Sequence, residues 1–269
     1  MKTYTKANKL NTFSMLALLW LGSFGVFGQV DLEPDWKWQN PLPTGNSLYD
    51  VQFLDAQIGW AVGQNGTILR TSNGGLSWLN QSIGNTNFFV SVYFVDSQNG
   101  WLVGYNGTIF KTSNGGNSWQ SQPSGTEDFL RSVYFIDNQK GWIVGDNGKI
   151  LNTINSGVTW ESQTSGTTMQ LNSVFFLDSL SGWIVGRNTI LSTTNGGNLW
   201  LSQPNVPQVN FKTVRFTNNQ NGFIDGFLKT SNSGISWESI LSGISGSSVH
   251  FINSQLGWAA GTGGIIKKT

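Results

Sequence analysis

Short runs of hydrophobic and polar residues recur along this chain in a fixed order. The triplet Val-x-Phe appears six times, followed after one residue by Asp or Asn and about six residues later by Gly-Trp or Gly-Phe. Side chains two residues apart on a strand point to the same face, so each triplet predicts a strand with one buried face. The triplets begin at Val51, Val92, Val133, Val174, Val214 and Val249.

The Gly-Trp pairs give the period of this repeat. A short apolar strand follows each pair, and three repeats then have Asn-Gly, which suits a type I′ hairpin because both turn residues need positive φ. A third strand follows the hairpin. Four short antiparallel strands in each repeat are typical of one blade of a β-propeller. The tryptophans of the pairs lie 41 residues apart at Trp60, Trp101, Trp142 and Trp183, and the series continues at Phe223 and Trp258.

A closing motif, Thr-x-Asn-x-Gly-x-(Ser/Thr)-Trp, ends five of the repeats, with Leu199 as the one departure. We predict a tight hairpin in which Asn and Gly adopt unusual backbone angles. The Trp is expected to fill the gap between neighbouring blades from the fourth strand. The motif spans residues 71–78, 112–119, 153–160, 193–200 and 230–237.

The pattern therefore predicts an all-β, six-bladed β-propeller that forms a single domain over residues 29–269. The sequence after Trp38 resembles the sequence after a closing Trp, and the chain stops where another closing motif would begin. We expect the N-terminal strand around Trp38 to supply the outer strand of the last blade, which would close the propeller without an exposed edge. An incomplete ring of seven or eight blades is the alternative. Blades four and five, which depart from the repeat at 187–189 and 224–227, are expected to have trimmed edges.

Residues 1–28 have the pattern of a secretory signal peptide. Lys2, Lys6 and Lys9 precede an apolar stretch over residues 13–27 that is short and interrupted for a membrane span. We predict cleavage after Gly28, no transmembrane segment in the mature chain, and a periplasmic, secreted or cell-surface location.

Composition narrows the classes of partner. The chain has no Cys, so it has no disulfide framework and its stability must come from burial. Without the three leader lysines, 12 basic residues face 14 acidic ones, a net charge of −2. A chain this close to neutral lacks the basic stripe of a nucleic-acid binder. We expect a monomer with no nucleic-acid partner and no cofactor.

The closing motif resembles the Asp-box, or BNR repeat, of sialidases and other propellers. The longer unit, Val-x-Phe-x-Asp followed by Gly-Trp-x-Val-Gly-x-Asn-Gly-Thr-Ile, more specifically resembles the propeller family of photosystem II stability/assembly factors, which has secreted bacterial relatives. The resemblance covers about residues 36–269 and implies a propeller. It also implies, as one possible function, an assembly factor that holds a protein client.

The sequence does not favour sialidase chemistry, a histidine metal site or calcium binding. A sialidase would need three Arg, a Tyr–Glu pair and an acidic residue around one substrate, whereas the four Arg here fall on four repeats. His250 stands alone without Cys, so we predict that it packs between blades and does not belong to a metal cluster, with a position lining a channel as the alternative. The recurring acids suit turns better than calcium, because each falls in a different repeat. These acids are Asp55, Asp96, Asp137 and Asp178.

The remaining candidate is a binding surface. Four antiparallel strands place the loops before each Val-x-Phe strand and the Asn-Gly hairpins on one face, and variable loops on a rigid scaffold commonly bind ligands. Ordinary solvated loops are the alternative. The residues that vary on this face are Tyr105, Glu127, Asp128, Asp146, Lys149, Met169, Gln170 and Arg187.

We therefore predict a non-catalytic scaffold that binds a protein or glycan partner, with an envelope assembly factor as the alternative and a sialidase-like glycoside hydrolase as a weaker one. A row of cations near the closing motifs is expected to be a solvated rim whose stems cover apolar strands, with an anion-binding ring as the alternative. This row comprises Arg70, Lys111, Lys229 and Lys268.

Overall fold

The structure, a computed structural model, describes residues 43–84, 86–204, 206–240, 246–251, 256–261 and 266–268. All of these belong to one unit, residues 39–269. The predicted signal peptide and the predicted strand around Trp38 lie outside the described residues. Within the described part of the chain, no helix is long and apolar enough to cross a membrane.

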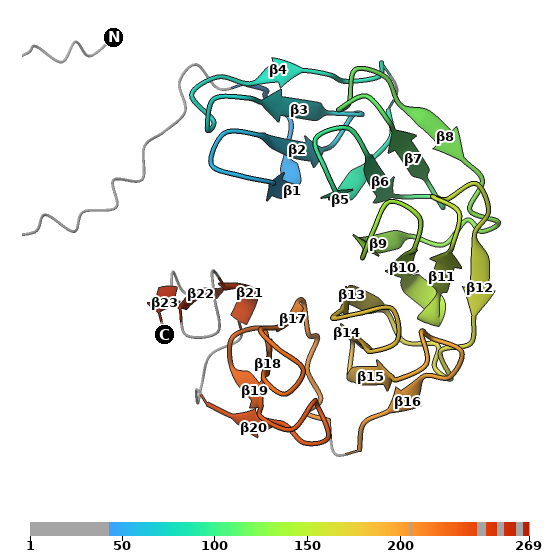
Figure 1. The fold of residues 1–269 in the computed structure, drawn as a ribbon, viewed down its shortest axis with the longest axis vertical. Helices are drawn as coiled ribbons and strands as arrows, with labels where there is room; N and C mark the ends of the chain where they lie inside the picture. The colour runs from blue at the N-terminus through green and yellow to red at the C-terminus, as the bar shows by residue number, and fades with distance from the viewer. Residues whose placement is uncertain are drawn as a thin grey trace, which may run out of the picture. The chain divides into compact units, whose positions relative to one another are not determined.

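Antiparallel sheets follow one another along the chain (Figure 1). In the described residues there are five four-stranded sheets and a sixth with three strands, numbered 1 to 6 here in chain order. Sheets 1 to 3 comprise β1 Leu48–Phe53, β2 Gly59–Gly63, β3 Ile68–Thr71, β4 Leu79–Asn80; β5 Phe89–Phe94, β6 Gly100–Gly104, β7 Ile109–Thr112, β8 Gln120–Gln122; β9 Leu130–Phe135, β10 Gly141–Gly145, β11 Ile150–Thr153 and β12 Glu161–Gln163.

The later sheets repeat this order with shorter strands in sheet 5. A three-residue 3₁₀ turn, Asp146–Gly148, is the helical element of the described residues. Sheets 4 to 6 comprise β13 Leu171–Phe176, β14 Gly182–Gly186, β15 Thr189–Thr193, β16 Leu201–Ser202; β17 Val214–Phe216, β18 Gly222–Ile224, β19 Leu228–Thr230, β20 Glu238–Ser239; β21 Gly246–Phe251, β22 Gly257–Gly261 and β23 Ile266–Lys268.

Each part of the repeat forms the strand predicted for it. The Val-x-Phe triplets lie on the first strand of each sheet, and the Gly-Trp segments form second strands that are buried along their length in sheets 1 to 4. Asn106 and Gly107, between β6 and β7, both have positive φ, at 54° and 63°. These are the angles that a type I′ hairpin requires, so the hairpin prediction is confirmed there.

The closing motif differs in one respect from its prediction. Asn114 does not have positive φ, and the unusual angles fall on Gly115 and Gly116, at 68° and 89°. The Asn acts through its side chain instead, since its Oδ1 accepts hydrogen bonds from the hydroxyl of Thr112 and from the Ser118 amide, both at 2.9 Å. The prediction was therefore wrong for Asn, because its amide group caps the turn from an ordinary backbone conformation.

Stacked aromatic rings join neighbouring sheets. The Trp101 indole of β6 lies flat on Phe135 of β9, with ring centroids 3.6 Å apart, and its Nε1–H donates to the Ser156 carbonyl in the closing motif of sheet 3. The closing residue Trp160 meets the same Phe135 ring edge-on at 5.9 Å. The Gly-Trp residues of sheets 1, 3 and 4 repeat the flat stack on the following sheet. The all-β propeller prediction is confirmed, and closure through Trp38 remains a prediction.

Candidate functional site

One surface is formed by the Asn-Gly hairpins and by the segments that precede each first strand, and we call it the loop face. The Gly107 amide donates to the Asp128 carbonyl at 3.0 Å, and the Gly148 amide donates to the Met169 carbonyl at 2.9 Å. Each hairpin is therefore held against the next sheet, as the strand order predicts. The loop face comprises hairpins 64–66, 105–107, 146–148 and 187–188 and segments 47–49, 87–88, 126–129, 167–170 and 209–210.

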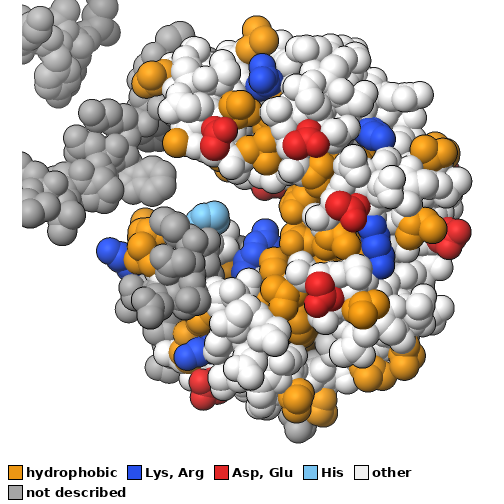
Figure 2. Space-filling view, in the orientation of Figure 1, with side chains coloured by type: hydrophobic (Ala, Val, Ile, Leu, Met, Phe, Trp, Pro, Cys, Tyr) orange, Lys and Arg blue, Asp and Glu red, His pale blue; other side chains and the backbone are white. Residues whose placement is uncertain are grey.

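Four aromatic rings follow one another across sheets 1 to 3 on the loop face, and we call them the aromatic row. Phe88 lies 4.7 Å from Tyr49 and 5.7 Å from Tyr105 between ring centroids, and Tyr105 lies 4.5 Å from Phe129. Tyr49 is 47% exposed and Tyr105 57% exposed. Figure 2 shows hydrophobic side chains gathered on this face beside charged ones. The row is a continuous apolar surface built by three sheets.

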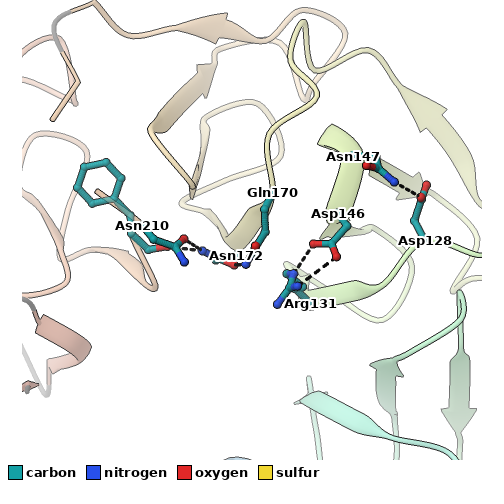
Figure 3. Close-up of polar contacts among 8 residues, drawn as sticks. Asp128, Arg131, Asp146, Asn147, Gln170, Asn172 and Asn210 are labelled. Atoms are coloured by element: carbon teal, nitrogen blue, oxygen red, sulfur yellow. Dashed lines mark hydrogen bonds and ion pairs between the residues drawn. The ribbon is translucent and has the colours of Figure 1, made fainter. Parts of the chain in front are cut away.

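An ion pair lies at the end of the aromatic row. Arg131 of β9 donates from Nε to Oδ1 of Asp146 at 2.5 Å and from Nη2 to Oδ2 at 3.1 Å (Figure 3). Its guanidinium also lies over the Phe129 ring, 4.3 Å from the centroid. A bidentate pair of this kind has a fixed orientation, so Arg131 and Asp146 form a rigid polar wall beside the rings.

Asp128 is the centre of a second polar group. It accepts hydrogen bonds from Asn147 Nδ2 at 2.7 Å and from the Thr126 hydroxyl at 2.8 Å, and Lys149 Nζ lies 3.5 Å from its Oδ2. The Asn147 bond, then the Thr126 bond, hold the pKa of Asp128 below its usual value. Asp128 therefore stays ionised at neutral pH, which is unsuited to a general acid.

Amide side chains continue the surface across sheets 4 and 5. Gln170 Nε2 donates to Asn172 Oδ1 at 2.6 Å, and Asn172 Nδ2 donates to Asn210 Oδ1 at 2.6 Å (Figure 3). Asn172 also donates to the Phe211 carbonyl at 2.5 Å. These amides contrast with the aromatic rings and ion pairs that sheets 1 to 3 contribute to the face.

The other predicted face residues lie where the strand order placed them. Glu127 and Arg187 are exposed, and Met169 is 42% exposed beside the 146–148 hairpin. A cleft of about 650 Å³ next to that hairpin is lined by hydroxyl groups and by Lys149.

Sequence reasoning missed six residues of this face. Two of them, Phe88 and Phe129, directly precede the first buried residue of a first strand, where other repeats have Ser47, Gln170 and Asn210. An aromatic residue at a position that is otherwise polar was the available signal. The missed residues are Tyr49, Phe88, Phe129, Arg131, Asn172 and Asn210.

The structure also gives the positions of the residues that could have served calcium or other metal binding. Asp55 Oδ1 accepts from the Gln57 and Ile58 amides, both at 2.7 Å, which lowers the pKa of Asp55 and makes it a turn residue. His250 is exposed on β21, which differs from the packed position predicted for it. In the described residues no three His, Cys, Asp or Glu side chains group as metal ligands do.

Three members of the cation row, Arg70, Lys111 and Lys268, lie over tryptophan rings. Arg70 lies over the Trp60 ring at 5.7 Å and Lys111 over Trp101 at 5.6 Å, because each faces that Trp across the β-ladder. This is the apolar packing expected of long cationic stems.

The solved structures that resemble this chain include named enzymes as well as a protein whose title names no enzyme activity. YCF48 bound to D1 peptide matches with a TM-score of 0.69 and 22% identity over 85% of this chain and 79% of that one. Virginiamycin B lyase from Staphylococcus aureus has a TM-score of 0.71 and 15% identity over 85% and 82%. An ancestral GH74 enzyme has 0.64 and 17% over 82% and 36%. At these identities the likeness shows the propeller fold alone.

The sequence itself gives a more specific result. No curated protein sequence matches the chain. The family model for photosynthesis system II assembly factor YCF48 matches three overlapping segments, residues 30–121, 81–162 and 123–204. Together these cover residues 30–204, well over half of the 269 residues. The chain belongs to the photosynthesis system II assembly factor YCF48 family.

Proposed function

We propose that this chain is a non-catalytic scaffold that binds a protein partner through its loop face and acts as an assembly factor. The aromatic row carries the proposal. Aromatic residues and Arg are enriched in the cores of protein interfaces, and here two exposed tyrosines belong to a row of rings that ends at a guanidinium fixed by an ion pair. Family membership and the YCF48 structure bound to D1 peptide support a protein as partner.

The acidic residues of the face support a binding role without chemistry. Asp146 accepts hydrogen bonds from Nε and Nη2 of Arg131, and Asp128 is held by Asn147, Thr126 and Lys149. A nucleophile or acid/base group would need a free position toward substrate. The purified mature protein is expected to leave sialosides and other glycosides intact. Hydrolysis that is lost in Asp128→Ala or Asp146→Ala would overturn the non-catalytic assignment.

Affinity capture tests the binding role. The mature protein, immobilised, is exposed to cell-envelope extract and compared with Tyr105→Lys and with Leu76→Lys. Leu76 is 83% exposed in the closing motif of sheet 1, away from the loop face. We expect the Tyr105 variant to lose the captured proteins and the Leu76 variant to keep them. Several immature clients would identify an assembly factor and one ligand a dedicated binder, whereas equal capture by both variants would contradict the proposal.

The leader pattern supports an envelope or extracellular location for this role. N-terminal sequencing of the protein recovered from cells is expected to begin at Gln29, directly after the predicted cleavage point. Recovery of the intact leader from a cytoplasmic fraction would contradict secretion.

A further inference from the structure

A pocket of about 510 Å³ lies between sheets 4 and 5, and none of its lining residues belongs to the loop face. Small-molecule sites in proteins have volumes of about 300–1,000 Å³. The lining residues, all in the described part of the chain, include no charged side chain, so the pocket suits an uncharged ligand. Its apolar walls are formed by Ile190, Pro204, Val206, Pro207, Leu228 and Trp237.

Glutamine side chains occupy the equivalent place at the two preceding interfaces between sheets. Gln163, at the end of β12, donates from Nε2 to the Gly196 carbonyl at 3.2 Å, and its Oε1 accepts from Trp200 Nε1 at 3.2 Å. Gly196 and Trp200 both belong to the closing motif of sheet 4. Gln122 of β8 likewise donates from Nε2 to the Ser156 carbonyl in the closing motif of sheet 3, at 3.3 Å. A carboxamide therefore joins the last strand of one sheet to the closing motif of the next.

Sheet 4 departs from this arrangement. Gln203 follows Trp200 by three residues, as Gln163 follows Trp160, so it is the equivalent glutamine. Its Nε2 donates to the Ser192 hydroxyl at 2.9 Å, and Ser192 lies on β15 of the same sheet. The carboxamide of Gln203 is thus held on sheet 4, and within the described residues it makes no hydrogen bond to the closing motif of sheet 5.

Sheet 5 keeps the two groups that such a carboxamide would engage. Trp237 Nε1 is buried without a hydrogen-bond partner, and burying a donor in this way costs free energy. The Ser233 carbonyl, which is equivalent to that of Gly196, accepts from Trp183 Nε1 at 3.2 Å and, among the described residues, from no glutamine. A carbonyl oxygen has two lone pairs, so one remains. The closing motif of sheet 5 therefore has one donor and one acceptor left for a ligand.

We propose that the pocket between sheets 4 and 5 binds a small uncharged molecule that carries a primary carboxamide on an apolar body. The carboxamide takes the place that Gln163 has at the preceding interface, so its oxygen accepts from Trp237 Nε1 and its nitrogen donates to the Ser233 carbonyl. The apolar body packs against Val206 and Leu228. This site goes beyond the proposed protein-binding role and does not depend on it.

Titration of ¹⁵N-labelled mature protein with three matched ligands tests the inference. 3-Phenylpropanamide is the probe, 4-phenyl-2-butanone has a methyl group in place of its amide nitrogen, and 3-phenylpropanoate has a charged carboxylate. We expect 3-phenylpropanamide to shift the Trp237 indole N–H resonance saturably. The ketone should bind about fivefold more weakly because it cannot donate to the Ser233 carbonyl, and the carboxylate about tenfold more weakly because no lining residue is a cation.

Three variants locate the binding site. Trp237→Phe removes the indole donor, identifies its resonance by the loss of the signal, and should weaken binding of 3-phenylpropanamide about tenfold. Trp160→Phe is the matched control and should leave binding unchanged, because there the Gln122 oxygen and the Trp160 indole nitrogen both lie against Gly157 and the place is filled. Val206→Trp fills the pocket and should abolish binding while the Trp237 indole signal remains.

Each contrary result overturns a stated part of the inference. Equal affinity for the amide and the ketone would contradict the carboxamide assignment. Full binding in Trp237→Phe or Val206→Trp would place the ligand elsewhere, and no binding of any of the three ligands would overturn the site itself. The pocket and the loop face share no residue, so protein capture can fail or succeed independently of these results.

Discussion

The middle sheets of this propeller and the sheets on either side of them use the same repeat with different results. Phe135 in sheet 3 is 1% exposed under the stacked Trp101, whereas Phe53, at the same place in sheet 1, is 43% exposed. Among the described residues Phe53 has an edge contact with Trp78 and no Trp stacked on its face. The repeat thus fixes the strand, and the neighbouring sheet determines whether its aromatic residue is core or surface.

Sheet 5 differs in its hairpin. Asp225 takes the place of the hairpin Asn, with φ of 52°, and accepts hydrogen bonds from the Lys212 and Thr213 amides at 2.8 and 2.7 Å. It is only 3% exposed. Where the middle sheets have a neutral amide, sheet 5 has an acid inside the protein.

The largest expected effect separates Phe135 from Phe53. Phe135→Ala should lower the free energy of unfolding by about 3–5 kcal/mol, because it leaves a cavity under two indole rings. Phe53→Ala should cost about 1 kcal/mol, since much of that ring is already exposed. Urea unfolding measures both. Equal losses would break the comparison and show that another sheet covers Phe53 in solution.

The second effect is a pH dependence that comes from Asp225. Burial, which outweighs the two amide hydrogen bonds, raises the pKa of Asp225 from 3.8 to about 6. The folded protein therefore holds this proton more tightly than the unfolded chain. Its contribution to stability is complete below about pH 4 and disappears as the pH rises through about 6, an effect of about 3 kcal/mol at most.

Asp225→Asn is the variant that isolates this effect. We expect it to match the parent protein near pH 4 and to be more stable at pH 8, as measured by urea midpoints. Asp55→Asn is the control variant. Two amide hydrogen bonds lower the pKa of Asp55, so its contribution to stability is lost only as the pH falls below its ordinary pKa of 3.8, outside the range in which Asp225 acts. A parent protein whose stability is flat from pH 4 to pH 8 would contradict the assignment.

The closing motifs of sheets 2 and 5 should contribute equally to stability. Thr112 in sheet 2 and Thr230 in sheet 5 each accept a 2.9 Å hydrogen bond from a glycine amide and donate to an Asn side chain. Thr112→Val and Thr230→Val should each lower the free energy of unfolding by about 1–3 kcal/mol. Losses that differ by more than the experimental error would show that the two turns are not equivalent.

The smallest effect on stability belongs to the aromatic row. Tyr105→Ala should change the free energy of unfolding by no more than about 0.5 kcal/mol, because surface substitutions rarely do more. Calorimetry of the parent and variant checks this. A larger loss would mean that the row is structural, which would weaken its assignment as a binding surface.

Most of the fold could be predicted from the sequence, because each position of the repeat occurs in several copies along the chain. Val-x-Phe, Gly-Trp and Asn-Gly predicted the first three strands of the sheets, since period-two burial and turn chemistry are local properties. The backbone angles of the closing motif were wrong for Asn, because a capping side chain and a left-handed residue are both typical uses of Asn.

The candidate site was reached only in part. Asp128 and Asp146 were assigned to the correct face from strand order, but Arg131 was not identified as the partner of Asp146. That pair depends on side-chain directions at two positions 15 residues apart. Phe88 was not distinguished from the many core aromatic residues of the repeats. Only the register between sheets shows that its ring contacts Tyr49 and Tyr105.

Site-specific crosslinking tests the central claim, that the loop face binds a protein partner, most directly. A photoreactive phenylalanine replaces Tyr105, Met169 or, as controls on closing motifs, Leu76 or Ile235, which are 83% and 75% exposed. Irradiation in the presence of envelope extract should give discrete protein adducts from positions 105 and 169 and none from 76 and 235. Adducts from the closing motifs alone, or the same adducts from all four positions, would contradict the account.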